Sequence, residues 1–410
     1  MITISNIKVE HGNTMALVIL CCRIYFKTAE LDDLNAFIDN NTIDWIDFIK
    51  TCRKHRIRPI AYKIILKITL PEEIHKRINK ELNKLTLQSF EQAKETERLI
   101  LLFQSNNINV LPYKGASFSK QFYGTINMRE SSDIDLVIHP DEISKSIAIL
   151  ENDGFQSHQK NYYFTLGHNR FIKRHKDFNF DKYLGNTRQY HVELHFNIIN
   201  KNIYVSKNQN EFKIDSLNKD CLFKEQVFVL NPIEHFRAIS LHHMLQEGMG
   251  YLKTIIDLTQ ALIKAETINH TTKYNSFEKE TLNELYTNYD IKIIKSLIIN
   301  IIGIDFKDKT IKKDFNKLLT SKILSSSYKK NITFDLPISE VIKFYFFYNK
   351  NTRAFYKKNR DKNLFSIRNL LTLLTPQPND FMAYKFPKNF YFLYYFIRPM
   401  RLVFFRKDPK

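Results

Sequence analysis

Two aspartates separated by a single residue, Asp133 and Asp135, stand in an apolar segment that predicts a strand over 134–138. Residues two apart on a strand share a face, so both carboxylates point the same way while Ile134 and Leu136 point into a core. Neighbouring carboxylates repel each other unless a cation lies between them. An all-oxygen pair suits Mg²⁺, which binds few protein carboxylates and completes its shell with water and substrate phosphates.

A glycine turn precedes this strand by about one helix length. Lys114-Gly115-Ala116-Ser117 follows a predicted strand over 108–112 and opens a predicted helix over 117–123. The free backbone N–H groups at a helix N-terminus form a natural seat for phosphate. Taken alone, Gly115 reads as an ordinary turn glycine. Together with the paired aspartates, it indicates a metal-dependent site for phosphoryl or nucleotidyl transfer.

A third carboxylate comes from the strictly alternating segment 191–196. There Glu193 shares a face with His191 and His195, as on a half-buried strand. If this strand lies beside the one with the aspartates, Glu193 completes a cluster that can hold two metal ions. One ion would activate the attacking oxygen and the other would steady the phosphates. The two histidines could be metal ligands or proton carriers, but packing or hydrogen bonding to a carboxylate is the favoured reading.

These motifs resemble the uncharacterised nucleotidyltransferase family of the DNA-polymerase-β-like superfamily. The resemblance is carried by a Lys-Gly pair, a downstream Arg, an Asp-hydrophobic-Asp strand and a Glu-Leu-His strand, over roughly residues 108–200. In this chain they are Lys114-Gly115, Arg129, Asp133-Ile134-Asp135 and Glu193-Leu194-His195. Weaker similarity on the flanks involves Asp44-Trp45 with His55-Arg56, Leu241-His242-His243 with Asp257, and Tyr394 to Leu402.

The resemblance implies an Mg²⁺-dependent enzyme, with a two-metal site, that moves a nucleoside monophosphate from a nucleoside triphosphate such as ATP to a hydroxyl or amine. Asp133, Asp135 and Glu193 would be the catalytic carboxylates and metal ligands. The donor phosphates would be bound by Lys114, Gly115, Ser117 and Arg129. The acceptor is expected to be a small molecule or a protein rather than nucleic acid, because no nucleic-acid module is visible. Where the superfamily usually has Gly-Ser or Gly-Gly, this chain has Gly115-Ala116.

The composition fits a mostly helical globular protein, with 43% hydrophobic residues but 9 Gly and 11 Pro in 410 residues. The expected fold class is α+β, a small mixed-sheet nucleotidyltransferase core flanked by N-terminal and C-terminal helical regions. Core strands are expected at 108–112, 134–138, 162–166, 170–173 and 190–196, with a helix from 140 to about 154. The chain is expected to be helical again from about Phe223. The expected domains are an N-terminal helical region (1–106), the core (107–205), a helical substrate or partner domain (206–340) and a basic aromatic region (341–410).

The basic aromatic region carries much of the net charge of +19, with 15 Lys and Arg residues against three Asp and no Glu. It could lie on an anionic membrane, bind nucleic acid, or pack its aromatics into the helical core. The four cysteines show neither CxxC nor zinc spacing, which indicates a reducing, cytoplasmic compartment. The apolar run 15–22 is too short to span a bilayer and has no signal-peptide pattern.

Two alternatives to an enzyme stay open. The protein could keep the nucleotidyltransferase fold as a catalytically lapsed scaffold or binding module, although a lapsed enzyme has no reason to keep three carboxylates. It could also be an antitoxin-like binding protein that neutralises a toxin. Against that reading, such proteins are typically much shorter than this chain.

Overall fold

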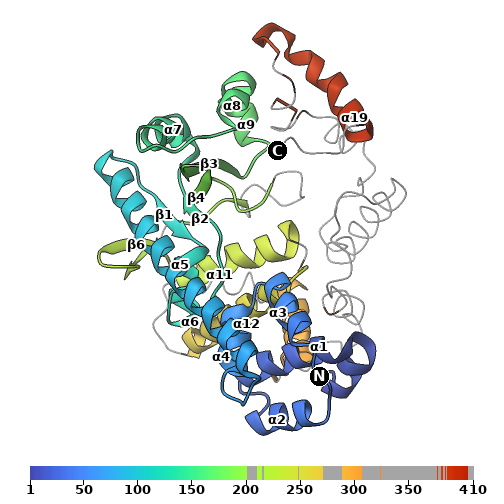
Figure 1. Ribbon diagram of the computed structural model, residues 1–410. Coiled ribbons are helices and arrows are strands. Elements are labelled where there is room, and N and C mark those ends of the chain that lie inside the picture. The colour runs from blue at the N-terminus through green and yellow to red at the C-terminus, as the bar shows by residue number, and fades with distance from the viewer. Residues whose placement is uncertain are drawn as a thin grey trace. The chain divides into compact units, whose positions relative to one another are not determined.

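The computed structural model describes residues 1–200, 210–214, 217–247, 249–270, 289–306, 324, 376, 380–381, 384 and 386–404. Figure 1 shows the order of the elements along the chain. Contacts divide the chain into two compact units. The first unit comprises Met1–Leu99, Pro112–Ser132 and Lys213–Asn331, and the second comprises Ile100–Leu111, Asp133–Phe212 and Ile332–Lys410. The four domains expected from the sequence stay a prediction.

The first unit begins with helices. They are α1 (Ile4–Tyr25), α2 (Leu31–Asp39), α3 (Trp45–Lys54), α4 (Arg58–Ile65) and α5 (Glu72–Ser105). Residues 15–22 of α1 are buried all round rather than along one stripe, because α2, α3 and α4 all pack on this helix. The helix α5 begins directly after Pro71, as the Pro-Glu-Glu sequence predicts.

The remainder of the first unit places further helices beside the glycine turn. The described elements are α6 (Gly115–Tyr123), the hairpin β5 (Leu217–Cys221) and β6 (Gln226–Leu230), α11 (Pro232–Leu241), a π-helical turn η2 (His242–Gln246), α12 (Leu252–His270) and α14 (Tyr289–Ile301). The helix α12 contacts α6, α11 and α14. The expectation of helix from about Phe223 is wrong for β6, where Val227 and Val229 are buried and Phe228 is exposed. This alternation is the pattern of a strand.

A buried histidine joins α3 to α12 in this unit. His55 follows α3 and is fully buried, and its Nδ1 accepts the N–H of Leu252 at 3.1 Å. Burial, followed by the nearby charge of Lys54, lowers the pKa of His55 to about 4. The neutral imidazole is therefore the form that belongs to the fold.

The chain forms a mixed sheet with strand order β1-β2-β4-β3, of which β2, β4 and β3 lie in the second unit. The strands are β1 (Leu111–Tyr113), β2 (Ile134–Val137), β3 (Asp177–Leu184) and β4 (Thr187–His195). The neighbours β2 and β4 run parallel, whereas β3 and β4 form an antiparallel hairpin. The helix α7 (Ile143–Asn152) follows a 3₁₀ turn, η1 (Pro140–Glu142), as predicted. The predicted fold class, α+β with a small mixed sheet and helical flanks, is confirmed.

Two predicted core strands are wrong. Residues 162–166 and 170–173 fall largely in the helices α8 (Lys160–Leu166) and α9 (His168–Ile172). In α8 the buried residues are Tyr162, Tyr163 and Leu166, while Phe164 is half exposed. This spacing belongs to a helix face rather than to a strand, so packing overrides the strand preference of the aromatic residues.

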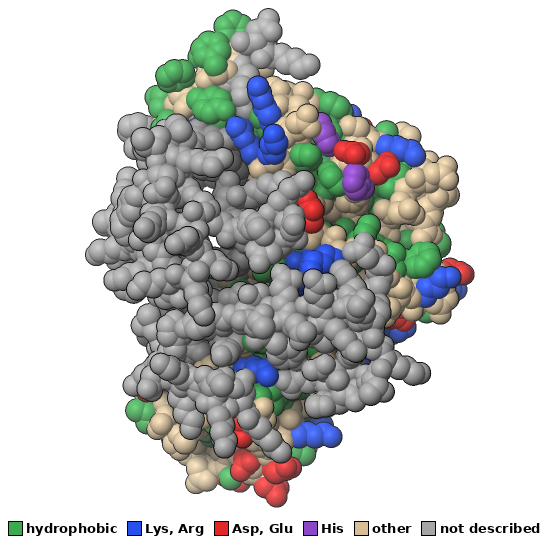
Figure 2. All heavy atoms as spheres, turned by 180° about the vertical axis from the view of Figure 1, so that it is seen from behind, with side chains coloured by type: hydrophobic (Ala, Val, Ile, Leu, Met, Phe, Trp, Pro, Cys, Tyr) green, Lys and Arg blue, Asp and Glu red, His purple; other side chains and the backbone are tan. Residues whose placement is uncertain are grey.

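The described C-terminal part consists of a 3₁₀ segment, η4 (Lys388–Leu393), and the helix α19 (Tyr394–Phe404). The buried carboxylate of Asp380 accepts from Arg401 Nε at 2.6 Å and pairs with Arg398 Nη1 at 3.3 Å. Hydrophobic side chains gather on the surface of this part (Figure 2); they include Phe390, Phe392, Phe396 and Met400. The rest of the predicted basic aromatic region lies outside the described residues. Within the described part of the chain, no helix has the length and apolar character needed to cross a bilayer.

Candidate active site

The sheet register places two of the predicted carboxylates side by side. Asp135 on β2 is the direct partner of Glu193 on the parallel strand β4. Val192 and Leu194 are fully buried on β4, so Glu193 projects from the other face of the strand. The condition for a carboxylate cluster, that the strand with Glu193 lies beside the strand with Asp135, is therefore met.

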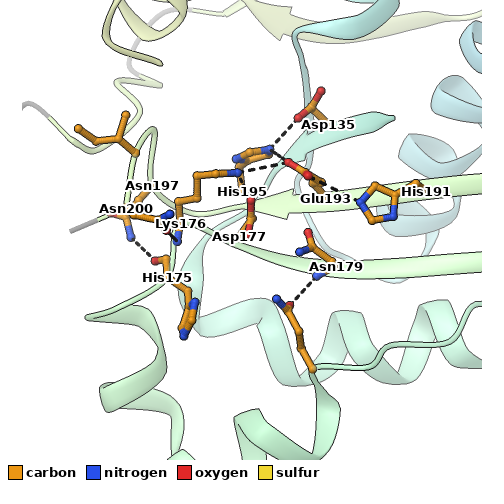
Figure 3. A network of polar contacts seen from close by, with 12 residues as sticks. Asp135, His175, Lys176, Asp177, Asn179, His191, Glu193, His195, Asn197 and Asn200 are labelled. Atoms are coloured by element: carbon orange, nitrogen blue, oxygen red, sulfur yellow. Dashed lines mark hydrogen bonds and ion pairs between the residues drawn. The ribbon is translucent and has the colours of Figure 1, made fainter. Parts of the chain in front are cut away.

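His195 lies between these two carboxylates (Figure 3). Its Nε2 is 2.8 Å from Asp135 Oδ1 and 3.1 Å from Glu193 Oε2. Asp135 and His195 are buried, whereas Glu193 is partly exposed. The three candidate ligand atoms all lie within 4.8 Å of one another. Two carboxylate oxygens and an imidazole nitrogen form a donor set that could hold a divalent cation. The carboxylates suit Mg²⁺ or Mn²⁺, whereas the imidazole is a ligand more typical of a transition metal.

Two positive groups flank Glu193. Lys176 Nζ lies 3.3 Å from Glu193 Oε2, and His191 Nε2 lies 3.7 Å from Oε1. Burial would raise the pKa of Glu193, but hydrogen bonds with His191 and His195, together with the charge of Lys176, hold it well below its usual range. Hydrogen bonds with Glu193 and with Asp181, at 2.7 Å, raise the pKa of His191 to about 9. Glu193 is therefore ionised and His191 is a cation at neutral pH.

The third predicted carboxylate, Asp133, is not among the ligand atoms that gather here. Asp133 lies one residue before β2 and is partly exposed. Among the described residues, the ligand atoms that gather within 4.8 Å come from Asp135, Glu193 and His195 and do not include Asp133. The strand β2 begins at Ile134, as predicted, and ends at Val137, one residue before the predicted end.

The glycine turn belongs to the first unit. Lys114 and Gly115 have φ values of +56° and +43°, a left-handed pair in which the lysine is strained. The N–H of Lys114 donates to His235 Nε2 at 3.1 Å, and His235 Nδ1 contacts Gln121 Oε1 at 2.8 Å. Lys114 is buried, with its ammonium 4.8 Å from the centre of the Tyr113 ring. These contacts hold the turn at the start of α6.

The segment that holds both groups matches a known family. A family model described as uncharacterised nucleotidyltransferase matches residues 41–272, which is more than half of the chain. The chain belongs to this nucleotidyltransferase family. The match confirms the resemblance drawn from the sequence motifs. No curated protein and no solved structure matches the chain.

In this nucleotidyltransferase, Arg129 takes part in a buried network of the first unit. Its Nε donates to Asp257 Oδ2 at 2.9 Å, and Tyr123 Oη donates to Oδ1 at 2.6 Å. His243 joins Asp257 Oδ2, at 3.0 Å from Nε2, to Glu247 Oε2, at 2.7 Å from Nδ1. The structure therefore gives Arg129, which the resemblance assigns to phosphate, a carboxylate partner within the protein.

The charges of this network stabilise one another. Burial would raise the pKa of Asp257, but Arg129 and His243 hold it well below its usual range. Burial would lower the pKa of His243, but Glu247 and Asp257 raise it. The pKa of Glu247 falls to about 2 despite burial, mainly through His243, with smaller contributions from Lys253 and Lys114. Arg129, Asp257, His243 and Glu247 thus form one linked network in the unit that carries the glycine turn.

Three residues beside the carboxylates were not singled out as ligands or counter-charges from the sequence. His195 was expected to pack or to bond a carboxylate, and the structure confirms a bond to a carboxylate. Its contact with both Asp135 and Glu193 could not be predicted, because it depends on the register of the strands. Lys176 and Asp177 precede and begin β3, which the sequence analysis did not predict. The alternation of Asp177, Phe178 and Asn179 is the signal that could have identified that strand.

Proposed function

We propose that the protein is a divalent-cation-dependent nucleotidyltransferase that moves a nucleoside monophosphate from a nucleoside triphosphate to a hydroxyl or amine of a small-molecule or protein acceptor. One observation carries the proposal. Asp135, Glu193 and His195 gather their ligand atoms within 4.8 Å, on adjacent strands of a segment that belongs to a nucleotidyltransferase family. In such a transfer the acceptor atom bonds to the α-phosphorus, pyrophosphate leaves and the acceptor loses a proton.

Asp135, Glu193 and His195 are the residues that would hold the cation, with Asp133 retained as a further ligand because it stands two residues before Asp135. When bound, the cation draws charge from the phosphate oxygens of the donor. The low pKa of Glu193 suits a ligand better than a general base, since an efficient base has a pKa near the working pH. We therefore assign Glu193 to binding rather than to proton transfer.

The glycine turn is proposed to seat the donor phosphates. Gly115 begins the nine-residue helix α6, whose first-turn N–H groups have no partner within the helix. The N–H groups near Ser117 and the ammonium of Lys114 would bind the phosphates there. Arg129 is proposed to hold the segment after α6 in place through Asp257, rather than to touch phosphate, because its Nε already donates to that carboxylate.

A thermal-shift panel tests the donor and the cation together. Wild-type protein is heated with ATP, GTP, CTP or UTP, with and without Mg²⁺ or Mn²⁺. We expect one metal–nucleotide pair to raise the unfolding midpoint, and the shift to disappear in Asp135→Asn. The matched control is Asp153→Asn, an identical substitution at a partly exposed partner of Lys182 in the same unit. If no nucleotide shifts the wild type, the catalytically lapsed scaffold or antitoxin-like reading replaces the proposal.

We also propose that α19 touches an anionic membrane surface. Phe390, Phe392, Phe396 and Met400 expose between 48% and 67% of their surface. Residues 386–404 contain three basic side chains, but Arg398 and Arg401 pair with Asp380, so the exposed hydrophobic side chains carry this proposal. Such contact would hold the protein at the membrane surface.

A further inference from the structure

Beside the proposed metal ligands, a lysine ammonium lies between two carboxylates. Lys176 Nζ is 3.3 Å from Glu193 Oε2 and also forms an ion pair with Asp177 (Figure 3). The side chain of Lys176 is 12% exposed, and that of Asp177 is 11% exposed. The ammonium is therefore part of the group rather than a solvated surface charge.

The backbone fixes the position of Lys176. Its N–H donates to Asn200 Oδ1 at 3.2 Å, and its carbonyl accepts the N–H groups of Phe196 and Asn197 at 2.9 and 3.1 Å. One residue on, Asp177 is the direct partner of His195 across the β3–β4 hairpin. The same hairpin that sets His195 against Glu193 therefore also sets the ammonium there.

The arrangement has the charge pattern of a two-cation site in which one cation is a side chain. In two-metal enzymes the ions lie about 3.5–4 Å apart and stabilise the attacking and leaving oxygens from two sides. Here Oε2 of Glu193 contacts both His195 Nε2 and Lys176 Nζ. His195 Nε2 also contacts Asp135, and Lys176 Nζ also contacts Asp177. The ammonium of Lys176 lies between the carboxylates of Glu193 and Asp177, where a second divalent cation would bind both.

We propose that Lys176 takes the place of a second divalent cation, so that the site binds a single divalent cation at Asp135, Glu193 and His195. This inference rests on the proposed function, and it differs from the two-metal site that the family resemblance implies. A lysine ammonium held against two carboxylates provides electrostatic stabilisation without needing a metal. One divalent cation per chain, rather than two, would then fill the site.

Counting bound Mn²⁺ tests the inference without measuring activity. Free Mn²⁺ gives an electron paramagnetic resonance signal that is lost on binding, so a titration yields the number of ions per chain. We expect one Mn²⁺ for the wild type and two for Lys176→Met, in which Glu193 and Asp177 lose their shared cation. Lys176→Arg should bind one, because it keeps the charge. Lys182→Met is the matched control on β3 and should also bind one.

Further variants separate this inference from the proposed function. The double variant of Lys176→Met with Asp177→Asn should return to one Mn²⁺, because the second ion loses a ligand. If Lys176→Met does not fold, Lys176→Gln carries the same expectation. Two ions per wild-type chain, or one in the folded uncharged variants, would overturn the inference while leaving the metal site intact. No Mn²⁺ on the wild type would overturn the metal assignment itself and this inference with it.

Discussion

Replacing Asp257 by asparagine should lower the free energy of unfolding by about 3–5 kcal/mol, the usual cost of removing one partner from a buried ion pair. Asp257 is fully buried, and its two oxygens meet Tyr123, Arg129 and His243 at 2.6–3.0 Å. Asparagine keeps the volume and one oxygen, but its amide group would face a donor where the second oxygen stood. The guanidinium of Arg129 would remain buried without the charge that balances it.

This cost is large against a typical domain stability of about 5–15 kcal/mol. The assay is urea unfolding followed by far-ultraviolet circular dichroism, with wild type and variant compared at the same pH and salt. At a slope of about 2 kcal/mol per molar urea, the midpoint should fall by about 2 M. The matched control is Asp220→Asn, which affects a partly exposed pair with Lys120 in the same unit and should cost less than about 1 kcal/mol.

A double-variant cycle isolates the ion pair. Arg129→Met alone should also destabilise, because it leaves Asp257 without its strongest positive neighbour. The combination of Arg129→Met with Asp257→Asn should cost clearly less than the sum of the two single changes, since neither charge is then left alone. A cost below about 1 kcal/mol for Asp257→Asn, or strict additivity in the cycle, would refute the reasoning.

Three further changes have defined outcomes. Asp135→Asn should lower transfer activity by more than about 100-fold while the far-ultraviolet circular dichroism spectrum stays that of the wild type, and retained activity would remove Asp135 from the site. Because the pKa of His55 is about 4 in the fold and ordinarily 6.5, stability should fall as pH drops from about 6.5 to 4, by up to about 3 kcal/mol. His55→Asn keeps an acceptor for the N–H of Leu252 but has no group that titrates there. Its free energy of unfolding, measured in urea, should therefore fall by about 3 kcal/mol less than that of the wild type over the same pH range. Equal falls in the two proteins would contradict the role of His55. Phe396→Ser should weaken sedimentation with phosphatidylglycerol vesicles about tenfold, while Phe164→Ser on α8 should not, and equal effects would exclude α19 as the contact.

The parts of the fold that could be predicted are those with a clear local period. Strict alternation over 191–196 identified most of β4, and the Pro-Glu-Glu start identified α5. The strand predicted over 162–166 is wrong because it was based on the intrinsic strand preference of aromatic residues. Which of these residues are buried depends instead on the elements that pack against them. Phe164 lies on the solvent side of α8, and no local sequence pattern predicts that this aromatic residue is exposed.

The candidate site divides in the same way. The types and spacing of Asp135 and Glu193 were sufficient to propose both as ligands, but that their strands are neighbours stood only as a condition, because the strand order of a sheet is not encoded in either strand alone. The contact of Lys176 with Glu193 depends on the turn between β3 and β4 and on the exact residue pairing across it, which periodicity does not encode. The partnership of Arg129 with Asp257 spans 128 positions of sequence, beyond the reach of any local pattern.

The strand order also determines when the site can exist during synthesis of the chain. β4 is the last of the four strands to be made, yet it lies between β2 and β3. Until β4 is inserted, Asp135 has neither Glu193 nor His195 beside it. Each residue of β2 is 58 positions before its partner on β4, as for Ile134 and Val192. Such non-local pairing is slow to form. The nascent protein therefore passes through a stage in which the first acidic strand is complete but cannot bind a cation.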